Sequence, residues 1–369
     1  MASAVISNPQ NFGGGFQNFV RDFKEQLRDL DYRIDAEQPP QIGDAAHQQV
    51  LDAFESSQLA CREFELEYGD NIDYLRSVQS QFRSEIAPWL CKSWIAERAH
   101  SKPSGFAGDF EMLIKLYDQA TPARGLGGYI DLCILDLPLA RAVRGRLATA
   151  RAYLLDEIAA RNTAVRILDI ASGPCREYLD WPAPQHELEV VALDNDQVAL
   201  DYVRQHVVPG LPARMQLRPE RYNALRTRSA EATQRKFGAF DIIYSVGLCD
   251  YLTDAHLIGL FRGWRDTLQD QGALYIAFKD TEQYDKTPYQ WHLDWFFYQR
   301  TESDVLALYE QAGFDLADMH TTRDETGIII NFLTRHVPSQ IRRVDGPSAS
   351  VPLGSSPVPP ARKMHGHAI

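Results

Sequence analysis

The first part of the chain shows the hydrophobic period of helices. From residue 16 onward, apolar residues recur every three or four positions and so fall on one face of an amphipathic helix; the first such stripe is Phe16, Phe19, Phe23, Leu27 and Leu30. The same spacing predicts further helices over about 45–59, 75–88, 109–117 and 129–160. Aromatic stripes of this kind are typical of packing between helices, and we therefore predict an all-helical cap domain over residues 16–150.

The second part of the chain alternates between short apolar runs and helical stripes. The runs predict strands, at about 165–170, 188–193, 214–217, 240–245 and 272–278, followed by an antiparallel pair at 314–320 and 327–334. Strands that alternate with helices indicate a parallel sheet with right-handed crossovers. We therefore predict a second domain, of the α/β class, over residues 151–336.

The two ends of the chain lack such a period. Residues 1–15 are polar and include three consecutive glycines, and residues 337–369 are rich in proline, serine and glycine. Segments of this composition cannot bury enough apolar surface to fold. We expect both ends to be disordered.

A strand and the turn after it carry the strongest chemical signal. The apolar run at 165–170 ends in Asp169, and Ala171, Ser172 and Gly173 follow at once. Small residues at such a turn let the backbone approach a ligand closely. The next strand ends in Asp194, and this offset of roughly twenty residues is the one at which a carboxylate can accept both hydroxyls of a ribose. The pattern indicates a nucleoside ligand; the alternative is an α/β turn that binds nothing.

The turn is neither a dinucleotide fingerprint nor a P-loop. Ala171 and Cys175 stand where the flanking glycines of a nucleotide loop would be, and no Gly-Lys-Ser/Thr follows. The turn resembles motif I of the class I S-adenosylmethionine (SAM) methyltransferases, D-x-G-x-G-x-G, of which it keeps only the central Gly173. This resemblance implies SAM as cofactor and a Rossmann-like, seven-stranded class I methyltransferase sheet beneath the helical cap.

A SAM site needs groups for three parts of the cofactor. Asp194 is the candidate acceptor for the ribose, the turn and the end of the fourth strand face the methionine part, and Asn195 and the Tyr222-Asn223 pair are candidates for the adenine. Arg176 either reaches the methionine carboxylate or pairs with Glu177 or Asp180. The predicted cofactor set is Asp169, Ala171, Ser172, Gly173, Arg176, Asp194, Asn195, Tyr222, Asn223, Ser245, Val246 and Gly247.

Two other segments are candidates for the acceptor side. In the first, Gly105 and Gly108 bracket Phe106, and Asp109 can cap a helix; this stretch is either a linker or a loop over the mouth of the site. The second, residues 289–298, is strongly aromatic and is either packing or a wall that suits an apolar substrate and a sulfonium cation. We predict that the catalytic residues are His292, Tyr289, Phe106 and Asp109, with His292 as the base if the acceptor is a hydroxyl.

The amino-acid composition limits which substrates and ligands we expect the protein to bind. The 369 residues carry a net charge of −12, which argues against nucleic acid as a substrate. Five scattered cysteines form neither a disulfide framework nor a zinc pattern, and no metal site is expected. There is no apolar run long enough for a membrane span and no signal-peptide pattern at the start. We expect a cytoplasmic protein that acts on a small molecule, and its oligomeric state stays open.

Three segments together resemble a narrower family. Residues 105–111, 167–176 and 294–301 look like the bacterial extracellular-factor (3-hydroxypalmitic acid methyl ester) biosynthesis methyltransferases, although Phe106 stands where that family leads us to expect tyrosine. The resemblance implies carboxyl or O-methylation of a 3-hydroxy fatty acid or a related secondary metabolite used in quorum sensing. Two alternatives remain: a SAM cyclase like the azetidine-2-carboxylate synthases, which release methylthioadenosine, and a non-catalytic SAM-binding sensor or partner protein.

Overall fold

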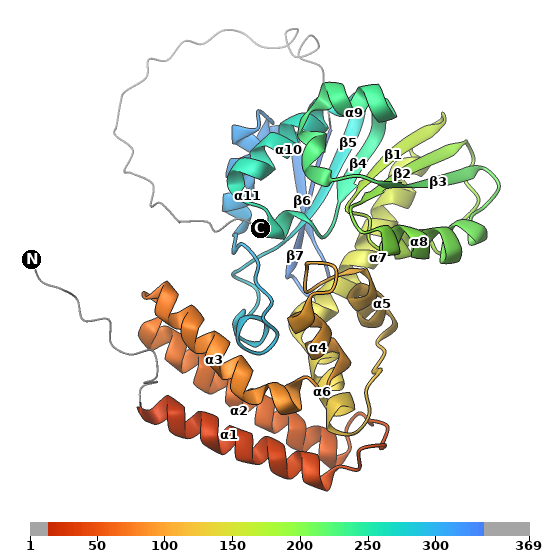
Figure 1. Cartoon of the computed structure of the whole chain (residues 1–369). Coiled ribbons are helices and arrows are strands. Elements are labelled where there is room, and N and C mark those ends of the chain that lie inside the picture. Colours follow the sequence, from red (N-terminus) through yellow and green to blue (C-terminus); the bar gives the residue numbers. More distant parts are fainter. Residues whose placement is uncertain (1–13, 336–369) are drawn as a thin grey trace, which may run out of the picture. The chain divides into compact units, whose positions relative to one another are not determined.

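The computed structural model describes residues 14–335 (Figure 1). Both segments predicted to be disordered lie almost wholly outside this range. The exception is the pair Gly14 and Gly15, which form the first turn of helix α1 and do not belong to a loop.

Seven helices precede the sheet: α1 (Gly14–Arg33), α2 (Ala45–Tyr68), α3 (Ile72–Leu90), α4 (Trp94–Ser101), α5 (Phe110–Asp118), α6 (Gly125–Asp136) and α7 (Pro138–Ala159). The aromatic stripe of α1 packs in the interior, where the Phe23 ring lies 5.7 Å from that of Phe54 and 6.3 Å from that of Phe82. These helices are therefore held together by aromatic packing, as their spacing predicts.

The prediction of a single helix over residues 129–160 is wrong. Two helices, α6 and α7, occupy this stretch, and the chain breaks at Leu137. Pro138 explains the break, because proline has no backbone N–H to donate and its ring excludes a preceding helical turn, while it fits the first turn of a new helix.

The sheet has seven strands, as predicted: β1 (Val165–Ile170), β2 (Leu188–Asp194), β3 (Met215–Arg221), β4 (Phe240–Ser245), β5 (Leu268–Lys279), β6 (Met319–Arg323) and β7 (Ile329–Arg335). The sixth was expected over 314–320 but begins only at Met319, after a short helical turn. Their order is β3-β2-β1-β4-β5-β7-β6, and only β7 runs antiparallel to its neighbours. This arrangement confirms the Rossmann-like, seven-stranded class I methyltransferase sheet. The strand order reverses between β1 and β4, which is the place where open α/β sheets bind ligands.

Helices cover both faces of the sheet: α8 (Gln197–His206), α9 (Ala230–Phe237), α10 (Asp254–Thr267) and α11 (Glu302–Gln311), together with α7. Trp264 of α10 is fully buried on one face and Leu154 of α7 on the other. Because both faces are covered, the central strands β1, β2 and β4 are mostly apolar, as is typical of buried parallel strands.

Helix α7 joins the helical part to the sheet (Figure 1). It runs without a break across residue 150, where we place the border between the two domains. The two parts also share one apolar core, in which Trp291 and Ile329 from the sheet half pack with Phe82 and other residues of the first helices. The division at residue 150 stays a prediction. None of the helices over residues 14–335 is long and apolar enough to span a membrane.

Candidate functional site

The turn after β1 is fixed against the end of β2. Ala171 and Gly173 both have positive φ angles, of 57° and 53°. The backbone N–H of Ser172 donates to the carbonyl of Leu193 over 3.0 Å, and that of Gly173 donates to Oδ2 of Asp194 over 2.8 Å. The turn and the predicted ribose acid are thus direct neighbours.

Asp194 is held in one orientation by backbone donors. Its Oδ1 accepts the N–H of Asp196 over 2.8 Å while its Oδ2 accepts that of Gly173. Burial raises the pKa of Asp194, and these two N–H groups oppose the rise. A carboxylate oxygen has two lone pairs, so each oxygen of Asp194 still has one with which to accept a hydroxyl.

Asp169 supports the turn from below. It is buried, and burial, followed by the charge of Glu177, raises its pKa well above the usual value. Glu177 in turn accepts a 2.5 Å hydrogen bond from the hydroxyl of Tyr244, and burial raises its pKa as well. The thiol of Cys175 points at Asp169 over 3.8 Å. These contacts indicate that Asp169 stabilises the turn from within the protein.

Two serines at the strand ends have different roles. The hydroxyl of Ser172 is buried and has no hydrogen-bond partner among the described residues, so it is available to a ligand. The hydroxyl of Ser245 donates to the carbonyl of Ile170 over 2.9 Å and so ties the end of β4 to that of β1. Val246 and Gly247 continue from Ser245 along the same edge.

The residues predicted for the adenine and the methionine carboxylate are only partly assembled. Tyr222 lies beside the ribose acid, since its N–H donates to the carbonyl of Asp194 over 2.9 Å. Asn195 is exposed next to that acid, whereas the Asn223 side chain caps a short helix at the N–H of Leu225. Arg176 pairs with Asp118 of α5 at 2.5 Å. Arg176 therefore pairs with an acid of the helical part, and not with Glu177 or Asp180 as the sequence suggested.

The loop between α4 and α5 lies over this edge of the sheet. Ser104 donates to Oδ2 of Asp196 over 2.6 Å, just beyond the end of β2. At the other side of the loop, a Cβ atom on Gly108 would come within 2.4 Å of the Trp295 ring and 3.1 Å of the Tyr251 hydroxyl. Only glycine permits this approach. The loop thus spans from the end of β2 to the segment after β4, which is the placement expected of a lid.

Asp109 does not face the site. Its carboxylate forms an ion pair with Arg98 at 2.8 Å and caps α5 by accepting the N–H of Met112 over 3.0 Å. The catalytic role predicted for Asp109 is therefore corrected to that of a buried helix cap, one of the roles its place in the sequence suggests.

Four aromatic residues form a wall next to the lid: Phe106, Tyr251, Trp295 and Phe297. Tyr251 is at the centre, because its hydroxyl accepts the indole N–H of Trp295 over 2.7 Å and its ring lies 5.5 Å from Phe106 and 5.3 Å from Phe297. Phe106 remains 43% exposed. This aromatic wall combines the predicted Phe106 with the second half of the 289–298 segment.

The first half of that segment belongs to the helical part. The imidazole of His292 is buried, and its Nε2 lies 2.9 Å from the hydroxyl of Ser57 on α2. The hydroxyl of Tyr289 accepts the N–H of Leu139, at the start of α7, over 2.9 Å. The catalytic roles predicted for His292 and Tyr289 are therefore corrected: both side chains are buried and bonded to residues of the helical part.

His292 makes folding stability depend on pH. Burial lowers its pKa to about 3, and the nearby Arg83 and His100 charges add to this effect. The unfolded chain binds a proton on this imidazole below about pH 6.5, whereas the folded chain binds it only below about pH 3. The free energy of unfolding therefore decreases as the pH is lowered through this window, by at most about 1.4 kcal/mol per pH unit.

We expect His292→Gln to remove that slope. Denaturant unfolding between about pH 6 and pH 4.5 measures it, and His320→Gln, at an exposed histidine, is the control that should keep the wild-type slope. Equal slopes for His292→Gln and the wild type would contradict the burial of a neutral imidazole.

Sequence reasoning missed a buried ion pair beside the aromatic wall. Asp250 follows β4 and Lys279 ends β5; the Lys279 N–H donates to Asp250 Oδ1 over 3.1 Å, and its ammonium pairs with Oδ2. The ammonium also lies 4.1 Å from the centre of the Phe297 ring. Burial lowers the pKa of Lys279 and Asp250 opposes this. A lysine that directly follows the apolar run 273–278 was the signal that could have revealed this ion pair.

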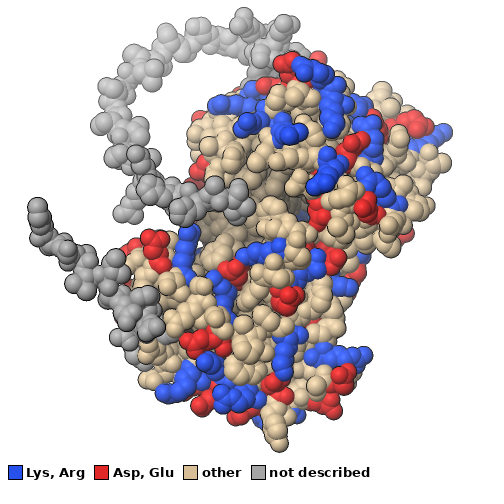
Figure 2. All heavy atoms as spheres, viewed as in Figure 1, with Lys and Arg blue, Asp and Glu red and all other residues tan. Residues whose placement is uncertain are grey.

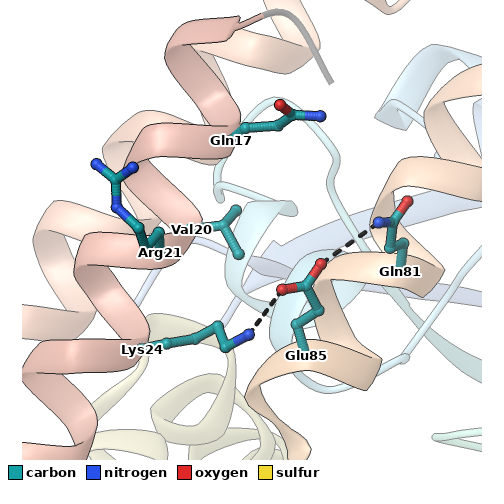
Figure 3. Close-up of a pocket in the computed structure, with 6 residues that line it drawn as sticks. All are labelled: Gln17, Val20, Arg21, Lys24, Gln81 and Glu85. Carbon is teal, nitrogen blue, oxygen red and sulfur yellow. Dashed lines mark hydrogen bonds and ion pairs between the residues drawn. The ribbon is translucent and has the colours of Figure 1, made fainter. Parts of the chain in front are cut away.

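A further surface feature is a groove on the helical part. A groove of about 210 Å³ lies between α1 and α3 and is lined by Gln17, Val20, Arg21, Lys24, Gln81 and Glu85 (Figure 3). Its walls come from these two helices alone, so it is separate from the sheet edge. Basic and acidic side chains are interspersed over the face that Figure 2 shows. Within residues 14–335, no three His, Cys, Asp or Glu side chains are grouped so as to hold a metal ion.

Comparisons with known proteins support the fold. No protein-family model and no curated protein matches the chain. Among solved structures, a possible exported protein from Bordetella parapertussis is 17% identical over 91% of this chain and 100% of that one, with a TM-score of 0.50. The CurJ carbon methyltransferase is 12% identical over 88% and 92% of the two chains, with a TM-score of 0.45. The magnesium protoporphyrin IX methyltransferase ChlM from Synechocystis PCC 6803, solved with bound SAM, is 11% identical over 54% and 83%, with a TM-score of 0.40. At these identities it is the fold that the chain shares, and the Bordetella structure shares it over nearly the whole chain.

Proposed function

We propose that this protein binds SAM at the carboxyl ends of β1, β2 and β4 and transfers its methyl group to a small, partly apolar acceptor. The contact between Gly173 and Asp194 carries the proposal. It places a sharp small-residue turn directly against an oriented carboxylate, and this combination suits a nucleoside that bears an amino-acid tail and no phosphate.

The residues present fit the parts of SAM. Asp194 offers free lone pairs for the ribose hydroxyls, and Tyr222 and Asn195 lie next to it for the adenine. The unpartnered hydroxyl of Ser172 and the backbone of Gly173 face the side where the methionine part would lie. SAM supplies an electrophilic methyl group on a sulfonium; the chain has to align the acceptor with it and exclude water.

The lid and the aromatic wall serve that alignment. The lid is bonded to Asp196 at one side and packs on Trp295 at the other, so it can exclude water from the edge of the sheet. The rings of the wall suit an apolar acceptor, and their faces attract a sulfonium cation. Of the acceptors that the sequence suggested, a carboxylate needs no base, which agrees with the position of His292 among the helices. We therefore propose the carboxyl group of a 3-hydroxy fatty acid as the acceptor.

Product analysis tests this function and separates it from its alternatives. The full chain is incubated with SAM, with and without 3-hydroxypalmitate. S-adenosylhomocysteine together with the methyl ester would support the proposal. Methylthioadenosine formed without any acceptor would identify the cyclase instead, and SAM that is bound but not consumed under both conditions would identify a sensor.

We expect Phe106→Ala to lower the turnover number about tenfold or more while SAM affinity stays nearly constant, because the variant loses part of the acceptor wall but no cofactor contact. Steady-state kinetics and calorimetry measure the two effects. Phe296→Ala is the matched control: Phe296 is also an exposed phenylalanine, but it packs under Arg83 and not on Tyr251. Wild-type turnover in Phe106→Ala would show that the lid does not contact the acceptor.

A further inference from the structure

Helix α7 buries an arginine that has no acidic partner. Arg146 is only 4% exposed, and its Nε has no hydrogen-bond partner. No carboxylate among residues 14–335 forms an ion pair with it. Arg141 on the same helix, by contrast, pairs with Asp136.

The helical period explains why Arg146 is inside. Ala142, Arg146 and Ala150 follow one another at four-residue spacing, and all three are buried. The two alanines are small enough to let α7 lie close to its neighbours, and Arg146 shares their buried face. The Tyr117 side chain is a hydrogen-bond partner of Arg146, but a neutral hydroxyl does not balance its charge. Burying a charge without a counter-charge is costly, so its retention needs an explanation other than stability.

The guanidinium lies at the ligand edge of the sheet. A Cβ atom on Gly247, just after β4, would lie 3.5 Å from Nη2 of Arg146. Burial raises the pKa of Tyr117 on α5, and the charge of Arg146 is the first effect that opposes this rise. Burial also raises the pKa of Glu177, which follows β1, and the charge of Arg146 opposes this rise. The Glu177 carboxylate already accepts a hydrogen bond from Tyr244. Arg146 thus lies where β1 and β4 meet and the strand order reverses.

We propose that Arg146 binds the carboxylate of the methionine part of SAM. The inference rests on the proposed function and names the residue that recognises the amino-acid end of the cofactor. A guanidinium matches a carboxylate with two parallel hydrogen bonds, and burial strengthens such a pair. Arg146 lies near the aromatic wall as well, because its charge opposes the rise in the pKa of Tyr251 and adds to the fall in the pKa of Lys279. Its 3.5 Å approach to Gly247, a residue of the predicted cofactor set, favours the cofactor over the acceptor as the source of the carboxylate. Arg176, the other candidate, is paired with Asp118.

The test compares SAM with decarboxylated SAM, which lacks only this carboxylate, by calorimetry on the full chain. We expect the wild type to prefer SAM by about tenfold or more. Arg146→Gln should reduce that preference to less than about threefold, through weaker SAM binding, while the affinity for decarboxylated SAM stays nearly unchanged. Arg144→Gln, on the same helix, is the control: Arg144 donates to the backbone of Leu135, and the variant should keep the wild-type preference.

A preference that survives in Arg146→Gln, or an equal loss of both ligands in a variant that melts at the wild-type temperature, would overturn the inference. If Arg146→Gln does not fold, Arg146→Lys decides: the preference should fall severalfold because lysine lacks the planar fork, and an unchanged preference would overturn it. Failure of the proposed function looks different, because the wild type would then bind neither ligand.

Discussion

Gly173→Val is expected to abolish SAM binding without preventing folding. Gly173 has a φ of 53°, and the only atom within 4 Å of a Cβ built there is Cδ1 of Leu113, at 3.7 Å. The fold therefore has room for the first side-chain atom, and the open space beside it is where the methionine part of SAM would lie. A valine would fill that space and would also strain the turn that presents the N–H group to Asp194.

A control at a second glycine separates the loss of SAM binding from the loss of stability caused by backbone strain. Gly43 also has a positive φ, of 83°, and no atom lies within 4 Å of its Cβ position. Gly43→Val should lose about 1–3 kcal/mol of stability from the same kind of backbone strain, yet it should bind SAM like the wild type. Calorimetric titration and thermal melting of both variants make the comparison. A Gly173→Val protein that still binds SAM would show that the cofactor lies elsewhere.

Asp194→Ala is expected to weaken SAM binding by about 1–3 kcal/mol, which is roughly 5- to 150-fold in the dissociation constant. The ribose hydroxyls lose a charged acceptor, and the turn loses the carboxylate that holds the Gly173 N–H group. Asp201→Ala provides the control, because Asp201 is a carboxylate on α8 that pairs with Arg204. Calorimetry reports both affinities, and an unchanged value for Asp194→Ala would refute the assignment of the ribose acid.

The sheet and its turn were predictable because their signals are local. An apolar run, a small-residue turn and a second run that ends in an acid specify β1, the turn and β2 within about thirty residues, and few other structures satisfy such a pattern. The register then brings Gly173 to Asp194 without any information from the rest of the chain.

The acceptor side was harder to predict because it depends on distant packing. The 289–298 segment is rich in aromatic residues on both sides of Asp294. Asp294 adopts a positive φ of 51°, and its carboxylate pairs with Lys102 and Arg83. The chain therefore turns at this residue: His292 before it goes to the helices, and Trp295 after it goes to the lid. Nothing in the order of the residues marks that change of direction.

The position of Arg146 was difficult to predict for the same reason, because it depends on packing with distant parts of the chain. Three arginines at positions 141, 144 and 146 look alike in the sequence, and arginine is usually exposed. Only the positions of the buried alanines at 142 and 150 distinguish the third arginine. The lesson from these residues is that a charge on the apolar stripe of a helix is worth examining as a ligand contact.

Hydrogen exchange with and without SAM tests most directly the central claim, that SAM binds at the carboxyl edge of β1, β2 and β4. SAM should slow amide exchange in residues 170–176, 194–197 and 245–251 and in the lid at 102–109, and should leave α1 and the surface groove beside it unchanged. No change at 170–176, or protection confined to the α1 and α3 groove, would contradict the account.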